Sequence, residues 1–359
     1  MDQICDMAEM LNAYICPAFS VKDAVIADAN HAARYLGLEP NTAIAPLLND
    51  RQAYEAFADG CLYLTLSFHD RDYSAAITRE DGYDLFILDH ELEQQQLWTL
   101  ALASQEMRIP LTDIMTGMEW MLQQLPQDGA ADSRKRSASV RRSLNQLHRM
   151  LCNMSDAARY SCETNIHQQT HDMVAVFDEV FEKAAVLAEQ KGVALRFRSL
   201  GQIVDGLADT EKIERAVLNL ISNALKATPK GGTIEARLTR HGNKLHLTVQ
   251  DSGPGIPAEK RAAVFTQYLR RPSLIDGAQG IGLGMVMVRA AAAAHDGTVL
   301  LEYPEGKGTK VTVTFSVRQS TSPRLGTPIS IPEFDYAGGW DHALLELSDA
   351  LPLSAYETE

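Results

Sequence analysis

Two asparagines and a lysine are spaced so that they could hold a phosphorylated ligand against one side of a helix. Residues 213–226 have the apolar period of a helix, and Asn219 and Asn223 are four residues apart, so they share a face. Carboxamide oxygens can coordinate Mg²⁺ or contact phosphates, and Lys226 adds a positive charge. Alone, such a pair is more often a solvated or capped helix face, so the pattern needs independent support.

Two glycine-rich segments provide that support. Residues 251–256 read Asp-Ser-Gly-Pro-Gly-Ile directly after a strand pattern, and residues 280–284 read Gly-Ile-Gly-Leu-Gly at the start of a helical pattern. Glycine lets a backbone approach phosphates closely, and a helix N-terminus offers unpaired N–H donors. The carboxylate of Asp251 could accept a hydrogen bond from the exocyclic amine of adenine, where guanine has a carbonyl. The ordered set is therefore typical of an ATP site.

In this order, the segments resemble the GHKL-type ATPases shared by gyrase, histidine kinases and mismatch-repair proteins. Phe265 fits the start of the lid, and Gly308-Thr309 before a strand pattern fits the last element of the site. The resemblance implies ATP and Mg²⁺ as cofactors, with Asn223 as the Mg²⁺ ligand, Asp251 on adenine and the second glycine segment in a mobile lid. The implied nucleotide-binding residues are Asn219, Asn223, Lys226, Asp251, Gly253, Gly255, Gly280, Gly282, Leu283, Gly284 and Thr309. A relic that no longer binds nucleotide is the alternative.

An upstream segment resembles the phosphoacceptor site of sensor histidine kinases of two-component systems, and the resemblance covers roughly residues 90–317. That family has His-Glu, an apolar residue, Arg, Thr or Asn, and Pro, whereas residues 105–111 read Gln-Glu-Met-Arg-Ile-Pro-Leu. The resemblance implies Glu106 as the catalytic base and Gln105 as a degenerate phosphoacceptor position. A carboxamide is a very poor nucleophile because its nitrogen lone pair is delocalised, so Gln105 should not be phosphorylated.

Two further positions affect the predicted chemistry. Ile109 stands where Thr or Asn would orient water for dephosphorylation of a response regulator, and an isoleucine side chain cannot hydrogen-bond water.

His90 is followed by Glu91 and offers an alternative phosphoacceptor, but Gln95 stands where the family has proline. It also lies 15 residues upstream of Gln105, which is about four helical turns. Both activities of the family, phosphorylation of its own histidine and dephosphorylation of the response regulator, are therefore in question.

Two long helical patterns surround this segment. Pro126, Gly129 and Asp132 mark a turn between them, so the pair predicts an antiparallel helical hairpin. One hairpin leaves its apolar seam half covered, and a second copy would complete a four-helix bundle. The seam consists of Leu97, Leu100, Met107, Leu111, Ile114, Met118, Met121 and Leu125 in the first helix, and Val140, Leu144, Leu147, Leu151, Met154 and Ala158 in the second.

The sequence as a whole predicts an α+β multidomain protein. Residues 1–90, with five short apolar runs, resemble a PAS sensor domain through residues 25–37, and an unrelated mixed domain is the alternative. Residues 91–162 form the dimerisation hairpin, and residues 163–317 form a two-layer α/β-sandwich ATP-binding domain. In the latter, strand patterns at 233–239 and 244–250 flank a turn at 241–243. Residues 318–359 are expected to be a linker with one short docking helix at 343–351.

Composition limits the classes of partner. The net charge is −14, which argues against a general nucleic-acid surface. Five cysteines without paired spacing argue against a disulfide framework or zinc site. The sequence predicts neither a membrane span nor a signal peptide, and therefore a cytoplasmic protein.

Two local features have simple structural interpretations. Residues 134–142 include five basic residues, and we interpret them as a solvated helix face or, less often, a partner contact. His295, before Asp296-Gly297, predicts a cation at a helix C-terminus with a glycine cap.

Three functions remain open. The first is a homodimeric sensor histidine kinase-like protein that binds ATP–Mg²⁺ and acts on a response regulator or partner kinase as a catalytically silent, nucleotide-gated module. The second is a protein histidine kinase that phosphorylates a partner or an unusual residue of its own. The third is slow ATP hydrolysis, for which only Glu211 and Glu214 stand near Asn219 in sequence as candidate bases.

Overall fold

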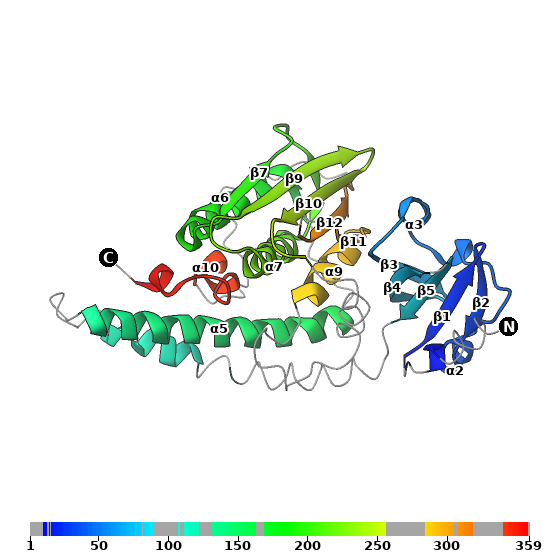
Figure 1. Cartoon of the computed structure of the whole chain (residues 1–359), viewed down its shortest axis with the longest axis horizontal. Helices are drawn as coiled ribbons and strands as arrows, with labels where there is room; N and C mark the ends of the chain where they lie inside the picture. Colours follow the sequence, from blue (N-terminus) through cyan, green and yellow to red (C-terminus); the bar gives the residue numbers. More distant parts are fainter. Residues whose placement is uncertain are drawn as a thin grey trace.

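A single ten-stranded sheet runs through most of the protein (Figure 1). The computed structural model describes residues 10–12, 14, 16–80, 82–88, 107, 111–118, 120–121, 131–162, 169–255, 284–304, 308–318 and 340–357. The strand order in the large sheet is β2-β1-β5-β4-β3-β11-β12-β10-β9-β7, and a separate pair joins β6 to β8. None of the helices in these ranges combines the length and apolar character that a bilayer crossing requires.

The N-terminal part is an antiparallel five-stranded sheet with short helices. Four of the predicted apolar runs, 18–21, 61–68, 73–77 and 83–88, lie within strands, and the fifth, 24–27, begins one residue before its strand. Phe19 and Phe86 stack in its core at 4.8 Å between ring centroids. Its elements are β1 (Ala18–Lys22), β2 (Val25–Ala29), α2 (His31–Tyr35), η1 (Ala45–Leu47), α3 (Arg51–Ala56), β3 (Cys61–Phe68), β4 (Arg71–Glu80) and β5 (Tyr83–Leu88).

The N-terminal sheet continues into the C-terminal sheet through one strand pair, which the sequence did not predict. Strand β3 pairs antiparallel with β11 (Val299–Glu302), so that Leu62 lies opposite Leu300. At the start of this pair Gly60 has φ +96°, and a Cβ there would lie 2.0 Å from the carbonyl oxygen of Leu301. The close approach of the two strands therefore requires glycine.

The second helix of the predicted hairpin is present as α5 (Ala131–Cys162). It begins before Asp132, so that residue lies in the first helical turn and not in the connection where the sequence placed it. Residues 111–118 and 120–121 are also helical, within the first predicted helix. Leu111 and Met115 pack against Leu144 and Leu151 of α5, which fits an antiparallel pair.

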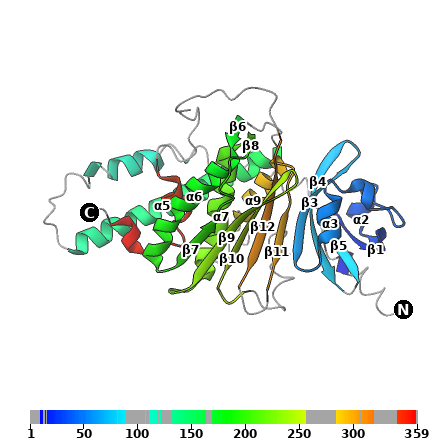
Figure 2. The same ribbon diagram turned by 90° about the horizontal axis from the view of Figure 1, so that it is seen from above.

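The C-terminal part is a mixed sheet with three helices on one face (Figure 2). The predicted hairpin is confirmed as β9 and β10, although the strand extends to His241 and the turn is shorter than expected. The elements are β6 (Gln169–Asp172), α6 (Met173–Lys191), β7 (Ala194–Arg198), β8 (Asp205–Ala208), α7 (Thr210–Ala227), β9 (Thr233–His241), β10 (Lys244–Asp251), α9 (Gly284–Ala294) and β12 (Lys310–Ser316).

The C-terminal residues dock against the helices. Helix α10 (His342–Glu346) is shorter than the predicted 343–351, and it is followed by turns and by η2 (Leu353–Tyr356). Leu345 and Leu347 are fully buried, and the segment contacts α5, α6 and α7. In Figure 1 it lies in red between α7 and the long helix α5.

His295 fixes the start of α7, and its predicted role as a helix-terminal cation is wrong. The ring is 1% exposed, its Nε2 accepts a hydrogen bond from the backbone N–H of Asp209 at 3.1 Å, and burial lowers its pKa. The left-handed residue after α9 is Asp296, with φ +47°. Gly297 serves a close approach instead, because a Cβ there would lie 1.7 Å from the Thr314 carbonyl oxygen.

We predict that Gly60→Ala destabilises the protein more than Gly82→Ala. Both glycines have positive φ, at +96° and +79°, but an added Cβ at Gly82 meets no described atom within 4 Å. The backbone strain alone costs about 1 kcal/mol, and the clash at Gly60 should add about 1 to 3 kcal/mol. Urea unfolding would measure the difference, and equal losses would contradict the close approach of β3 and β11.

We also predict that His295→Gln flattens the pH dependence of stability below pH 6.5. The folded state holds a neutral ring, so its pKa lies below the unfolded value of 6.5. Stability from this site is therefore present above pH 6.5 and falls as pH drops, by at most about 1.4 kcal/mol per pH unit. Denaturation midpoints from pH 7 to 5 would be compared with the exposed control His31→Gln, and identical pH slopes in both variants would refute this role.

Candidate functional site

The helix face predicted to meet phosphates is present on α7, but Asn219 is wholly buried. Its Nδ2 donates to the carbonyl oxygen of Arg215 at 2.9 Å, and its Oδ1 accepts from Nη2 of Arg149 at 3.0 Å. A Cβ on Gly284, the first residue of α9, would lie 2.8 Å from the same Oδ1. The N-terminus of α9 and the asparagine face of α7 therefore meet. Asn223 is half-buried one turn further along.

Asp251 ends β10 in a cradle of backbone groups and is 6% exposed. Its Oδ1 accepts from the N–H of Gly253 at 2.8 Å, and its Oδ2 accepts from the N–H of Thr309 at 3.1 Å. Gly308 has φ +74°, and a Cβ there would lie 2.3 Å from Oδ1 of Asp251. Because a side chain at 308 would collide with the carboxylate, the Gly308-Thr309 pair is required by the position of Asp251.

The surroundings of Asp251 act on the pKa of its carboxyl group in two opposing ways. Burial raises the pKa of Asp251, while the hydrogen bonds from Gly253 and Thr309 oppose the rise. The turn is packed closely against α7, since a Cβ on Gly253 would lie 2.6 Å from the carbonyl oxygen of Ala227. Asp251 and the end of α7 are therefore held in close contact through this turn.

Lys226 is engaged by an acidic residue that the sequence analysis missed. Its Nζ lies 3.0 Å from Oδ2 of Asp349, and Nη1 of Arg149 lies 2.8 Å from the same oxygen. Burial lowers the pKa of Lys226, against the opposing charge of Asp349. Burial alone would raise the pKa of Asp349, but the charges of Arg149 and Lys226 outweigh it and hold that pKa below its usual value.

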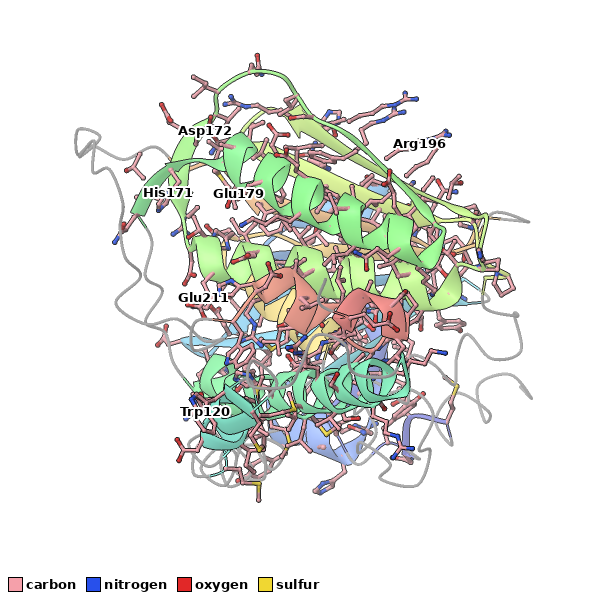
Figure 3. All side chains as sticks on the ribbon, turned by 90° about the vertical axis from the view of Figure 1, so that its left-hand side faces the viewer. Trp120, His171, Asp172, Glu179, Arg196 and Glu211 are labelled. Carbon is pink, nitrogen blue, oxygen red and sulfur yellow. The ribbon has the colours of Figure 1, made fainter. Side chains whose placement is uncertain are left out.

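A second carboxylate, Glu346, lies between two buried guanidinium groups. It is 0% exposed, with Oε2 2.9 Å from Nε of Arg149 and Oε1 3.3 Å from Nε of Arg215. Arg215 also donates from Nη2 to Oδ1 of Asn153 at 3.0 Å. Figure 3 shows the C-terminal segment between α7, whose first turn carries the labelled Glu211, and α5.

Several predicted site residues lie outside the described residues: Gln105, Glu106, Ile109, His90, Phe265, Gly280, Gly282 and Leu283. Glu214, a candidate base for hydrolysis, is placed, and its Oε2 lies 3.0 Å from Nδ1 of His342. Arg149, Glu346 and Asp349 were missed because no local motif marks them. The only available signal was charge, since a basic stretch of α5 and an acidic C-terminal segment are complementary.

The donor set fits ATP on its adenine side. The Asp251 carboxylate lies in a glycine-lined cradle that leaves no room for a Cβ at 308, and the N-terminus of α9 lies beside Asn219. For Mg²⁺, the available protein ligand is a carboxamide oxygen, a hard donor that suits the ion when phosphate oxygens complete its coordination. The described residues contain no group of three or more His, Cys, Asp or Glu that could hold a metal without a nucleotide.

Comparison with protein families places this site in a known class. Residues 208–319 match the family described as histidine kinase-, DNA gyrase B-, and HSP90-like ATPase. The match begins just before α7 and ends after β12, so it contains Asn219, Asp251 and Thr309.

Curated relatives extend the similarity beyond that domain. The chain is 27% identical over 244 residues to the adaptive-response sensory kinase SasA of Parasynechococcus marenigrum, covering 68% of this chain and 62% of SasA. It is 29% identical over 247 residues to the signal transduction histidine-protein kinase/phosphatase MprB of Mycobacterium tuberculosis, covering 66% of this chain and 47% of MprB. The chain thus spans about half to three fifths of the length of these two relatives.

A solved structure shares the fold. Full-length ShkA in complex with AMPPNP superimposes with a TM-score of 0.50 at 23% identity, covering 62% of this chain and 46% of ShkA. Residues 208–319 are therefore a histidine kinase-, DNA gyrase B-, and HSP90-like ATPase domain, carried in a chain that is similar to signalling histidine kinases.

Proposed function

We propose that this chain is a histidine kinase-like protein of two-component signalling that binds ATP and Mg²⁺ and lacks the usual phosphoacceptor histidine. The observation that carries the nucleotide proposal is the Asp251 cradle within the ATPase-family domain. In this proposal Asp251 accepts the adenine amine, while Asn219, Asn223 and Lys226 face the phosphates and the metal. Mg²⁺, when bound, neutralises phosphate charge.

The remaining nucleotide-binding residues are proposed from the family pattern. Gly253, Gly255 and Thr309 surround the adenine side, where Gly255 has φ +69° and packs against Gly308. Gly280, Gly282, Leu283 and Gly284 form the segment that approaches the phosphates. The three glycines of this segment would let the backbone approach a phosphate closely, because they carry no Cβ.

At the acceptor position the chain has Gln105 followed by Glu106. A carboxamide cannot form the phosphoramidate that an imidazole forms, so phosphorylation at this position is excluded on chemical grounds. Two modes of action are compatible with this. Either the domain phosphorylates a histidine on a partner chain, with Glu106 as base, or it acts as a nucleotide-gated binding partner of a response regulator or another kinase.

The hairpin supports a homodimeric assembly through a four-helix bundle. Apolar side chains on both of its helices are exposed in the single chain, including Trp120 at 63% and Leu147 at 50%. A second copy of this chain, packed hairpin to hairpin, would cover both sets. The N-terminal five-stranded sheet is proposed as a PAS-like sensor, and its pairing to β11 would connect a sensed ligand to the ATPase domain.

We predict that Asp251→Asn weakens ATP binding and reduces discrimination against GTP. The substitution replaces a charged acceptor by a neutral amide and places an NH₂ group against the donors of Gly253 or Thr309. Loss of a hydrogen bond to a charged group costs about 1.5 to 3 kcal/mol, so affinity should fall about tenfold or more. Calorimetric titration would measure it, with Asp178→Asn on the exposed face of α6 as the matched control. Unchanged ATP affinity in Asp251→Asn would refute the assignment.

We predict that Gln105→His gains acid-labile label from γ-labelled ATP while the wild-type chain stays unlabelled. Histidine restores the nucleophile, and Glu106 already follows it. The control is Gln105→His combined with Asp251→Asn, which should remain unlabelled. Acid-labile label on the wild-type chain would instead identify another phosphoacceptor histidine, and label on neither protein would favour the non-catalytic binding role.

A further inference from the structure

The C-terminal segment 340–357 presents two carboxylates to the phosphate side of the candidate nucleotide site. Asp349 reaches Lys226 of α7 at 3.0 Å, and Glu346 reaches Arg215 of the same helix at 3.3 Å. Arg149 of α5 contacts both carboxylates, at 2.8 Å and 2.9 Å. Acidic side chains of one segment thus pair with cations on two helices that bound the site.

The same contacts engage the residues that the proposed function assigns to phosphate. Arg149 donates to Oδ1 of Asn219, the oxygen that would face a phosphate-bound cation. Lys226, the nearest point charge for a phosphate, is bonded to Asp349. Carboxylate and phosphate oxygens are acceptors of the same class and take the same charge-assisted hydrogen bonds.

We propose that segment 340–357 is a tethered acidic ligand of the nucleotide site, in which Asp349 occupies Lys226 and, together with Glu346, holds Arg149 against Asn219, so that the segment competes with ATP. This deepens the proposed function and rests on it. Nucleotide phosphates would take Lys226 and Asn219, and the part of the segment that carries Asp349 would leave its position over α7, while Glu346 keeps its pairs with Arg149 and Arg215. The ATPase domain would then be silenced by its own C-terminus until nucleotide or a partner displaces it.

The segment is held by contacts that can be broken stepwise. Its apolar side chains are buried, with Leu345 against Cys152 of α5, whereas Asp349 is 30% exposed. The Ser348 carbonyl accepts long hydrogen bonds of 3.5 Å from Arg142 and Gln146. Competition at Asp349 therefore loosens the end of the segment that follows α10 while Leu345 remains buried. Such a tethered ligand acts at a high effective concentration, so a weak contact suffices to compete.

The test is ATP–Mg²⁺ titration of the full chain by calorimetry, comparing wild type with Asp349→Asn, Glu346→Gln and the matched control Glu357→Gln. Glu357 is exposed at the end of the same segment. Because Glu346 is fully buried, the Glu346→Gln variant can fail to fold. The ATP affinity of Asp349→Asn relative to wild type therefore decides whether the segment competes with ATP. We expect Asp349→Asn to tighten ATP binding roughly fivefold or more, and Glu357→Gln to bind like wild type.

Hydrogen exchange of segment 340–357 provides a second readout. We expect ATP–Mg²⁺ to accelerate exchange of the amides that follow α10, including that of Ala350, which donates to the carbonyl oxygen of Leu347. Equal ATP affinity in wild type and Asp349→Asn, with unchanged exchange on adding ATP, would overturn the competition while leaving nucleotide binding intact. If no variant binds ATP at millimolar concentration, the proposed nucleotide function fails and the competition is overturned with it.

Discussion

Two buried guanidinium groups and one buried carboxylate determine how the helices of this protein meet. Arg149, Arg215 and Glu346 are 5%, 0% and 0% exposed, respectively. A charge in that environment is tolerated only when it is paired and hydrogen-bonded, and removing one partner of such a group costs about 3 to 5 kcal/mol. The three residues come from α5, α7 and α10. If one of these helices shifted alone, a buried charge would therefore lose its ion-pair partner.

That constraint gives the candidate site its present form. Arg149 is oriented by Glu346 and Asp349, and it in turn engages Asn219. On the opposite side, the position of Asp251 depends on backbone donors and on the absence of a side chain at Gly308. The surroundings of Asp251 are thus set by local backbone geometry, whereas those of Asn219 and Lys226 are set by charged residues that are distant in sequence.

This division explains what could be predicted from the sequence. Helix α7 and the β9–β10 hairpin follow from apolar periods and turn residues within short windows, and both are confirmed. The contact between Arg149 and Glu346 joins residues 197 positions apart, and no local pattern encodes it. His295 was misread for the same reason, because its distant partner Asp209 and its burial, not its place at the end of α9, decide its charge.

The pairing of β3 with β11 also has a consequence for synthesis of the chain. Leu62 and Leu300 face each other across that pair although roughly 240 residues separate them. At about 5 to 20 residues per second, the ribosome needs roughly 10 to 50 seconds to deliver β11 after β3 has formed. Throughout that interval β3 is the open edge of a finished five-stranded sheet, with four consecutive buried-type residues at its start. Such an edge pairs readily with other strands, so β3 is open to pairing with another chain until β11 is synthesised.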